Sequence, residues 1–153
     1  MKSLRYFLLI AVALFTGYSS FGQMIADPAT WKVEVKKKSA DTYQLIFHLS
    51  LKQGWHVYAK TKGMDESLIV PSFTFDKNSS VTINGEATAK GILVSKNVEG
   101  FGPVSTYSDK VIYTQNITAK KGAKVSGSYT YQTCNDSICL PPKTKNFSVV
   151  IKN

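Results

Sequence analysis

The chain has 153 residues, the length of about one domain, and its 19 lysines and arginines against 10 aspartates and glutamates give a formal net charge of +9. Hydrophobic residues make up 43% of the chain and aromatic residues 12%, which excludes a disordered chain, and their dispersal excludes a multi-span membrane protein. Two cysteines are too few for a disulfide scaffold or a four-thiolate zinc site.

The amino-terminal segment has the pattern of a secretory signal peptide. A positively charged start precedes an unbroken apolar run over residues 6–15, and small residues follow up to an expected cleavage before Gln23. The run is too short to span a bilayer. We therefore expect residues 1–22 to be removed and residues 23–153 to form one exported domain that is not embedded in a membrane.

The charge of the mature chain comes from lysine alone. Removing the signal peptide takes away Lys2 and Arg5, and leaves 17 lysines against 10 acidic residues, a net charge of +7. Nucleic-acid-binding proteins usually contact base edges and phosphates through the planar guanidinium group of arginine, which forms two parallel hydrogen bonds. The ammonium group of lysine lacks this geometry. We therefore expect no nucleic-acid partner, and we interpret the charge as a solvated basic surface.

The mature chain is predicted to form strands almost throughout. Apolar and polar residues alternate over residues 31–36 and again over residues 43–51, the period of a half-buried strand. Further strands are expected over 55–59, 68–75, 80–83, 91–95, 111–117, 125–133 and 147–151. Turn signals lie between them at Lys62-Gly63, Asn84-Gly85, Gly100-Phe101-Gly102-Pro103 and Lys121-Gly122.

These short, evenly spaced strands predict an all-β fold. No stretch of twelve or more residues shows a helical stripe of apolar residues, and no repeat or second-domain linker is present in the sequence. The pattern favours one antiparallel β-sandwich, with a closed barrel as the alternative.

The two cysteines are close together in the sequence. Cys134 and Cys139 enclose Asn135-Asp136-Ser137-Ile138, and Pro141-Pro142 follow. Asn, Asp and Ser favour a turn, and a hairpin closed by four residues brings its flanking positions opposite each other at a separation that a disulfide accepts. The prolines cannot donate ladder hydrogen bonds, so the chain beyond Cys139 is expected to follow a sheet edge or leave the sheet.

A disulfide that closes so short a loop removes little conformational entropy from the unfolded chain. It therefore adds little to the stability of the fold. An exposed bridge at a sheet edge is instead open to attack by another thiolate, as thiol–disulfide exchange requires. A structural disulfide and metal binding by the pair remain alternatives at this point. We expect no cofactor and no metal, because no histidine stands at ligand spacing from the two thiols.

The stretch Tyr131-Gln132-Thr133-Cys134-Asn135-Asp136-Ser137-Ile138-Cys139-Leu140-Pro141-Pro142 resembles the active-site hairpin of the amino-terminal periplasmic domain of the thiol:disulfide interchange protein DsbD. Two further segments are similar to segments of that domain and occur in the same order along the chain. Gly54-Trp55-His56-Val57-Tyr58 is similar to the family's aromatic Gly-Tyr-Tyr segment, and Glu99-Gly100-Phe101-Gly102 is similar to its cap loop. The resemblance covers residues 27–151.

The resemblance implies an immunoglobulin-like β-sandwich with a redox-active cysteine pair. Cys139 would bond to the partner protein and Cys134 would resolve the mixed disulfide. Phe101 on the cap loop would shield the pair, with Glu99 beside it, and Trp55 and Tyr58 would help to line the site. The activity implied is that of a periplasmic protein-disulfide reductase, and cytochrome maturation is among the processes that it could serve.

The sequence departs from the family pattern at three points. Four residues separate the cysteines where the best-known members have five, and the acidic pair of the cap loop is reduced to Glu99 followed by Gly100. The family protein continues into a membrane electron-conducting domain and a thioredoxin-like domain, and this chain ends at Asn153. We therefore expect a separate membrane protein as electron donor and thioredoxin-like periplasmic proteins as acceptors.

Two functions remain in competition. The first is thiol–disulfide interchange through Cys134 and Cys139, and the second is a secreted immunoglobulin-like binding module whose disulfide is purely structural. Trp31 is expected to pack in the core, and His48 to be exposed on its strand. For His56, a packing role and a role in lining the site are both open.

Overall fold

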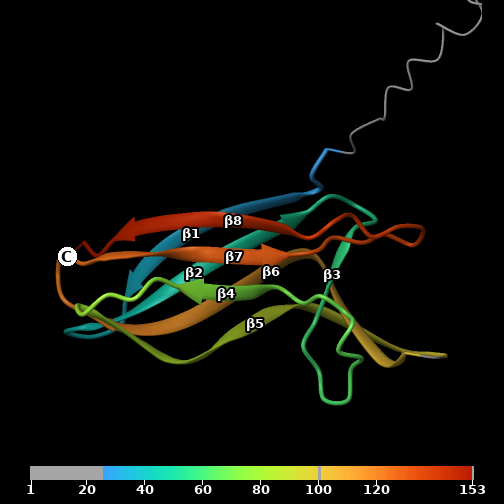
Figure 1. Cartoon of the computed structure of the whole chain (residues 1–153), viewed down its shortest axis with the longest axis horizontal. Coiled ribbons are helices and arrows are strands. Elements are labelled where there is room, and N and C mark those ends of the chain that lie inside the picture. Colours follow the sequence, from blue (N-terminus) through green and yellow to red (C-terminus); the bar gives the residue numbers. More distant parts are fainter. Residues whose placement is uncertain (1–25, 100, 153) are drawn as a thin grey trace, which may run out of the picture.

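The computed structural model describes residues 26–99 and 101–152, so the predicted signal peptide lies outside the described residues. Eight strands account for most of the described chain (Figure 1). They are β1 (Ala29–Lys37), β2 (Thr42–Leu51), β3 (His56–Tyr58), β4 (Ser72–Phe75), β5 (Val81–Val98), β6 (Gly102–Ala119), β7 (Lys124–Tyr131) and β8 (Lys143–Val150). The described residues contain no helix long and apolar enough to cross a membrane.

The strands form two antiparallel sheets that pack face to face. In the larger sheet the order is β1-β2-β6-β3, with β5 paired along the other side of β6, and in the smaller sheet it is β4-β7-β8. This arrangement is the immunoglobulin-like antiparallel β-sandwich that we predicted. Two separate sheets rule out the alternative of a single closed barrel.

The core lies between the sheets and follows the alternation of the sequence. On β2, Tyr43, Leu45, Phe47 and Leu49 are each at most 2% exposed, while the residues between them face outward. Trp31 of β1 reaches across to the smaller sheet and lies 4.7 Å from the ring of Tyr129 and 5.2 Å from that of Tyr131 on β7, measured between ring centroids. The expected core role of Trp31 is therefore confirmed.

The structure corrects the predicted strands at β5. Residues 80–83 and 91–95 were expected as separate strands with a turn at Asn84-Gly85, but β5 runs without interruption to Val98. The predicted turn is a bulge, where the pairing with β6 shifts between Asn84 and Thr88. The Gln115 side chain donates to the carbonyls of Asn84 and Gly85 at 3.0 and 3.1 Å, which satisfies backbone groups that the bulge takes out of the ladder.

Other strand boundaries also differ from the prediction. Only Ser72–Phe75 of the expected strand over residues 68–75 pairs with a neighbour. Strand β6 begins at Gly102, well before the expected residue 111, because its first half pairs with β5 and β3. Strands β5 and β6 thus form a long hairpin, and its turn lies at the same end of the sandwich as the loop between β7 and β8 (Figure 1).

Candidate functional site

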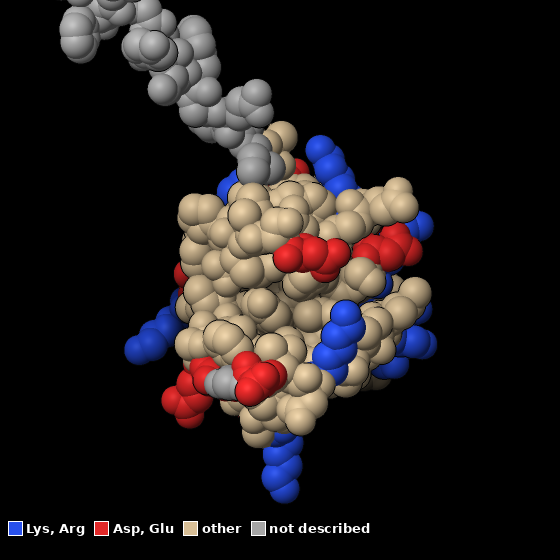
Figure 2. All heavy atoms as spheres, turned by 90° about the vertical axis from the view of Figure 1, so that its right-hand side faces the viewer, with Lys and Arg blue, Asp and Glu red and all other residues tan. Residues whose placement is uncertain are grey.

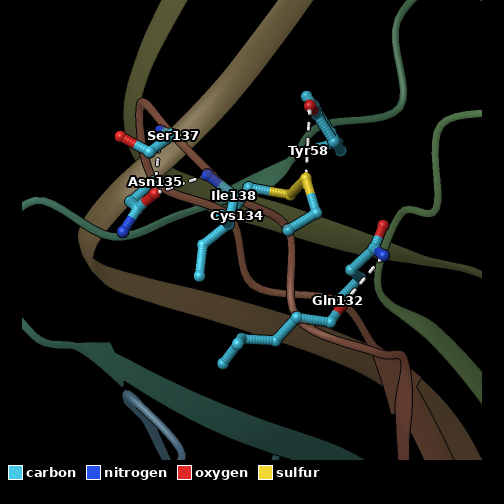
Figure 3. The surroundings of a disulfide bond; sticks show 8 residues. Tyr58, Gln132, Cys134, Asn135, Ser137 and Ile138 are labelled. Atoms are coloured by element: carbon cyan, nitrogen blue, oxygen red, sulfur yellow. Dashed lines mark hydrogen bonds between the residues drawn. A yellow bond between two sulfur atoms is a disulfide. The ribbon is translucent and has the colours of Figure 1, made fainter. Parts of the chain in front are cut away.

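The two cysteines form a disulfide in the loop between β7 and β8 (Figure 3). Their sulfur atoms are 2.00 Å apart and their α-carbons 4.0 Å apart. The two residues face each other as an antiparallel bridge, and the backbone nitrogen of Leu140 donates to the carbonyl of Thr133 at 2.9 Å. The predicted cross-turn bridge is therefore present.

The four residues between the cysteines form the expected turn. Asn135 Oδ1 accepts hydrogen bonds from the backbone nitrogens of Ser137 at 2.9 Å and Ile138 at 2.8 Å. The backbone nitrogen of Asn135 donates to the carbonyl of Ile138 at 2.9 Å. At the base of the loop, Gln132 Nε2 donates to the carbonyl of Leu140 at 3.0 Å. These bonds satisfy the backbone groups of the turn within the cysteine loop itself.

The two sulfur atoms have different surroundings. Cys134 is 1% exposed and belongs to the interior, whereas Cys139 is exposed on the outer side of the loop. The hydroxyl of Tyr58 lies 3.9 Å from Cys139 Sγ, within hydrogen-bonding distance for sulfur (Figure 3). An attacking thiolate can therefore reach Cys139, and the leaving sulfur would be that of Cys134.

Strand β3 connects the cysteine loop to the larger sheet. The backbone nitrogen of His56 donates to the carbonyl of Cys134 at 2.9 Å, and that of Cys134 donates to the carbonyl of His56 at 3.0 Å. On its other side, β3 pairs with residues 106–108 of β6. The buried cysteine is thus fixed by an element far from it in sequence.

A groove of about 490 Å³ lies beside the cysteine loop, between β3 and the outer half of the β5–β6 hairpin. Figure 2 turns this end of the molecule toward the viewer and shows charged side chains scattered around uncharged surface. The groove is lined by Gly54, Trp55, His56, Tyr58, Val94, Lys96, Val98, Val104, Thr106, Ser108, Asn135 and Asp136.

The pKa of His56, which lines this groove, is displaced from its ordinary value. Partial burial lowers the pKa of His56 below its ordinary value of 6.5, because burial disfavours the charged imidazolium. The negative charge of Asp136 acts in the opposite direction and raises it, and the positive charge of Lys96 lowers it further. The balance leaves the imidazole of His56 largely neutral at pH 7.

The structure brings together only some of the predicted site residues. Trp55 and Tyr58 line the groove beside the cysteine loop. Phe101 and Glu99 lie at the turn of the β5–β6 hairpin and do not line this groove, and Phe101 is 48% exposed. In Figure 1 the turn and the cysteine loop project separately from the same end of the sandwich.

Lys96 and Asp136 were missing from the predicted site, and His56 was undecided. The alternation of His56 and Tyr58 around the buried Val57 is a sequence signal that both side chains leave the core on one face. No sequence pattern indicates that Lys96 lines the groove. The predicted strand ended at Ser95, whereas β5 continues to Val98. The described residues contain no cluster of three or more His, Cys, Asp and Glu side chains that could hold a metal ion.

The solved structures with a similar fold include two periplasmic or DsbD amino-terminal domains. The amino-terminal periplasmic domain of ScsB from Proteus mirabilis superposes with a TM-score of 0.57 and 17% identity over 90% of this chain, and this chain spans only 50% of that one. The amino-terminal domain of DsbD from Neisseria meningitidis, in its reduced form, gives a TM-score of 0.54 and 17% identity over 80% of this chain and 86% of that one. At this identity the likeness shows the fold.

The family is shown by the sequence. No curated protein matches the chain. The sequence model described as "Thiol:disulfide interchange protein DsbD, N-terminal" matches residues 22–151, which include both cysteines and every strand of the sandwich. The chain therefore belongs to the family of the amino-terminal domain of the thiol:disulfide interchange protein DsbD, and its cysteine pair lies within the matched residues.

Proposed function

We propose that Cys134 and Cys139 are the redox pair of a protein-disulfide reductase. The observation that carries this proposal is the unequal exposure of the two cysteines: Cys139 is exposed and Cys134 is 1% exposed. A disulfide that only stabilised the fold would not need one accessible sulfur next to a groove. An exchange site needs one sulfur for the partner and a second one protected until the mixed disulfide has formed.

The reaction follows from this asymmetry. In the reduced domain, the Cys139 thiolate attacks a sulfur of the partner's disulfide, and the partner's other sulfur leaves as a thiolate. Cys134 then attacks Cys139 Sγ, the bond between Cys139 and the partner breaks, and the partner's second sulfur leaves. The partner's disulfide gains two electrons, and the cysteine pair is oxidised to the disulfide seen in the structure.

The electron donor and acceptors belong to the same proposal. The donor is a membrane electron-conducting protein that reduces the Cys134–Cys139 disulfide, and the acceptors are oxidised thioredoxin-like proteins of the periplasm. Residues 1–22 are a signal peptide and residues 23–153 the exported domain. The family description and the periplasmic location printed for the ScsB domain support this assignment. Cytochrome maturation is one process that such an acceptor could serve.

The aromatic residues around the pair have a protective role in this proposal. Trp55 and Tyr58 are the aromatic residues without a titratable imidazole in the groove lining, and their role would be to limit the access of small oxidants to Cys139. Phe101, with Glu99 beside it, is the residue of the β5–β6 turn that would cover the pair while no partner is bound. A docking protein would displace this cover and reach the sulfur.

The first test is to trap the mixed disulfide. With oxidised glutathione as the probe, we expect the Cys134→Ala variant to form a stable glutathione adduct at Cys139, because no second thiol is present to release it. The Cys139→Ala variant is the matched control. It is expected to react at least about tenfold more slowly, because the remaining thiol is buried. Intact-protein mass spectrometry over time measures both rates.

The second arm of this test is the reduction potential of the wild-type pair, measured against glutathione redox buffers. An interchange domain equilibrates with these buffers, whereas a structural disulfide lies below about −300 mV. A potential below that value, together with equal adduct formation by the two single-cysteine variants, would contradict the proposal. It would favour a secreted binding module with a structural bridge.

A further inference from the structure

His56 is the cross-strand neighbour of the buried cysteine. The two residues exchange both backbone hydrogen bonds, at 2.9 and 3.0 Å, so they form a directly opposed antiparallel pair. The side chains of such a pair lie on the same face, with their β-carbons about 5 Å apart. The side chains of His56 and Cys134 therefore leave the backbone on the same face and within reach of each other, although their positions differ by 78 in the sequence.

The buried thiol needs a base when it reacts. Cys134 attacks as a thiolate, but at 1% exposure it has almost no contact with water that could take its proton. Desolvation also disfavours an unpaired thiolate at this position. A neutral imidazole next to the sulfur meets both requirements, since it accepts the proton and then places a positive charge beside the thiolate.

The groups around His56 favour the neutral imidazole, which is the form that can accept a proton. Its ring lies 5.8 Å from the ring of Tyr58, measured between centroids, and both side chains line the groove. Two charges of opposite sign face it from different elements, Asp136 from the cysteine loop and Lys96 from β5. Partial burial and Lys96 lower the pKa of His56, and Asp136 raises it, so the free base predominates at pH 7.

We propose that His56 is the general base that takes the proton from the Cys134 thiol when Cys134 resolves the mixed disulfide. The inference rests on the proposed function. The proton moves from Cys134 Sγ to the imidazole, the Cys134–Cys139 bond forms, and the bond between Cys139 and the partner breaks. The partner's sulfur leaves with the electron pair and takes a proton from the imidazolium or from water, which restores neutral His56.

The experiment follows the two steps separately with one chromogenic probe, 5,5′-dithiobis(2-nitrobenzoic acid). The reduced protein is mixed with an equal amount of the probe in a stopped-flow instrument. Attack by Cys139 releases the first thionitrobenzoate, and resolution by Cys134 releases the second. The proposed function requires the first phase, and the role of His56 concerns only the second.

For His56→Gln we expect the second phase at pH 7 to be slower by at least about tenfold, with the first phase unchanged within about twofold. The matched control is His48→Gln, because His48 is the other histidine of the chain and lies on β2 beside Glu34, 3.0 Å from its carboxylate. This control is expected to leave both phases unchanged.

The pH profile gives a readout that a purely structural role would not change. In the wild type, the rate of the second phase is expected to rise through a group that titrates below pH 6.5 and then to level off. In His56→Gln it should rise only at the higher pH where a thiol ionises. Asp136→Asn should move the wild-type inflection to lower pH, and Lys96→Gln should move it to higher pH.

The possible results distinguish a failure of the redox function of the cysteine pair from a failure of the role of His56. If the second phase of His56→Gln has the wild-type rate and pH profile, the role of His56 is overturned while the redox pair stands. If the wild type shows no first phase, the proposed function fails and the inference fails with it. Should His56→Gln not fold, the wild-type profile decides, and a second phase without an inflection below pH 7 overturns the role of His56.

Discussion

At the scale of single residues, we expect the hydroxyl of Tyr58 to raise the reactivity of the Cys139 thiol. Their atoms lie 3.9 Å apart in the disulfide form, and a hydrogen bond from a hydroxyl is stronger when the acceptor is an anion. The reduced Cys139 thiolate is therefore the species that gains most from Tyr58. For Tyr58→Phe we expect alkylation of Cys139 by iodoacetamide at pH 7 to slow by about tenfold, in line with one lost charge-assisted bond.

Tyr113→Phe is the matched control for this measurement. The hydroxyl of Tyr113 is buried and finds no hydrogen-bond partner among the described residues, so removing it costs no bond. The alkylation rate should stay at the wild-type value. Equal rates for Tyr58→Phe and wild type would show that Tyr58 only packs against the disulfide.

At the scale of elements, the smaller sheet depends on a close approach between β4 and β7. Gly127 of β7 pairs with Phe75 of β4, and a β-carbon at position 127 would collide with the carbonyl oxygen of Thr74. Backbone atoms cannot move aside as a side chain can, so Gly127→Ala is expected to lower the free energy of unfolding by about 3 kcal/mol. Urea denaturation measures this change.

Ser128→Ala is the control on the same strand, and it should change the free energy of unfolding by less than about 0.5 kcal/mol. Amide hydrogen exchange shows which strand is affected. In Gly127→Ala the backbone amides of β4 are expected to lose protection from exchange before those of the other strands. Strand β7 leads directly into the cysteine loop, so the rigidity of this sheet also supports the site. A Gly127→Ala variant as stable as wild type would mean that β4 is not held at this distance.

At the scale of the whole molecule, Asp27 links the two sheets. Its carboxylate precedes β1 of the larger sheet and accepts a hydrogen bond of 2.6 Å from the hydroxyl of Tyr131 on β7. Lys143 and Lys145 of β8 lie 3.3 and 3.2 Å from it. Burial by itself would raise the pKa of Asp27, but the hydrogen bonds from Tyr131 and the backbone of Ala29 and the charge of Lys145 outweigh it and lower the pKa to about 2.

This displacement predicts a pH-dependent contribution to stability. A carboxyl group whose pKa is lowered on folding stabilises the fold fully above its ordinary pKa of 3.8, and the contribution is lost as the pH falls through about 2. For Asp27→Asn we expect a loss of about 2 kcal/mol at pH 7, and the difference from wild type should shrink between pH 4 and pH 2.

Urea denaturation at a series of pH values checks this prediction. Asp41→Asn, a substitution at an exposed position, should change stability by less than about 0.5 kcal/mol at either end of the range. A difference between Asp27→Asn and wild type that stays constant down to pH 2 would show that packing at this position matters and the charge does not.

Much of the fold could be predicted because the signals are local. The alternation along β2 places five apolar side chains in the core, and the same period identifies β1 and β7. The cysteine loop was equally predictable, since Asn135 forms its turn with residues two and three positions away. The uninterrupted course of β5 could not be predicted, because Asn84-Gly85 is typical of both a turn and a bulge. The hydrogen bonds that Gln115 on β6 donates to the carbonyls of these two residues stabilise the bulge, and they join residues far apart in the sequence.

The sequence by itself determined the strand period, the cross-turn disulfide and, through the resemblance of its cysteine hairpin, the family. Only the tertiary structure decided which sulfur is buried and which groups surround it. That outcome depends on β3, which pairs with β6 on one side and places His56 opposite Cys134 on the other. Such pairing joins residues far apart in the chain, and its energy comes from burial and backbone hydrogen bonds that leave no local pattern in the sequence.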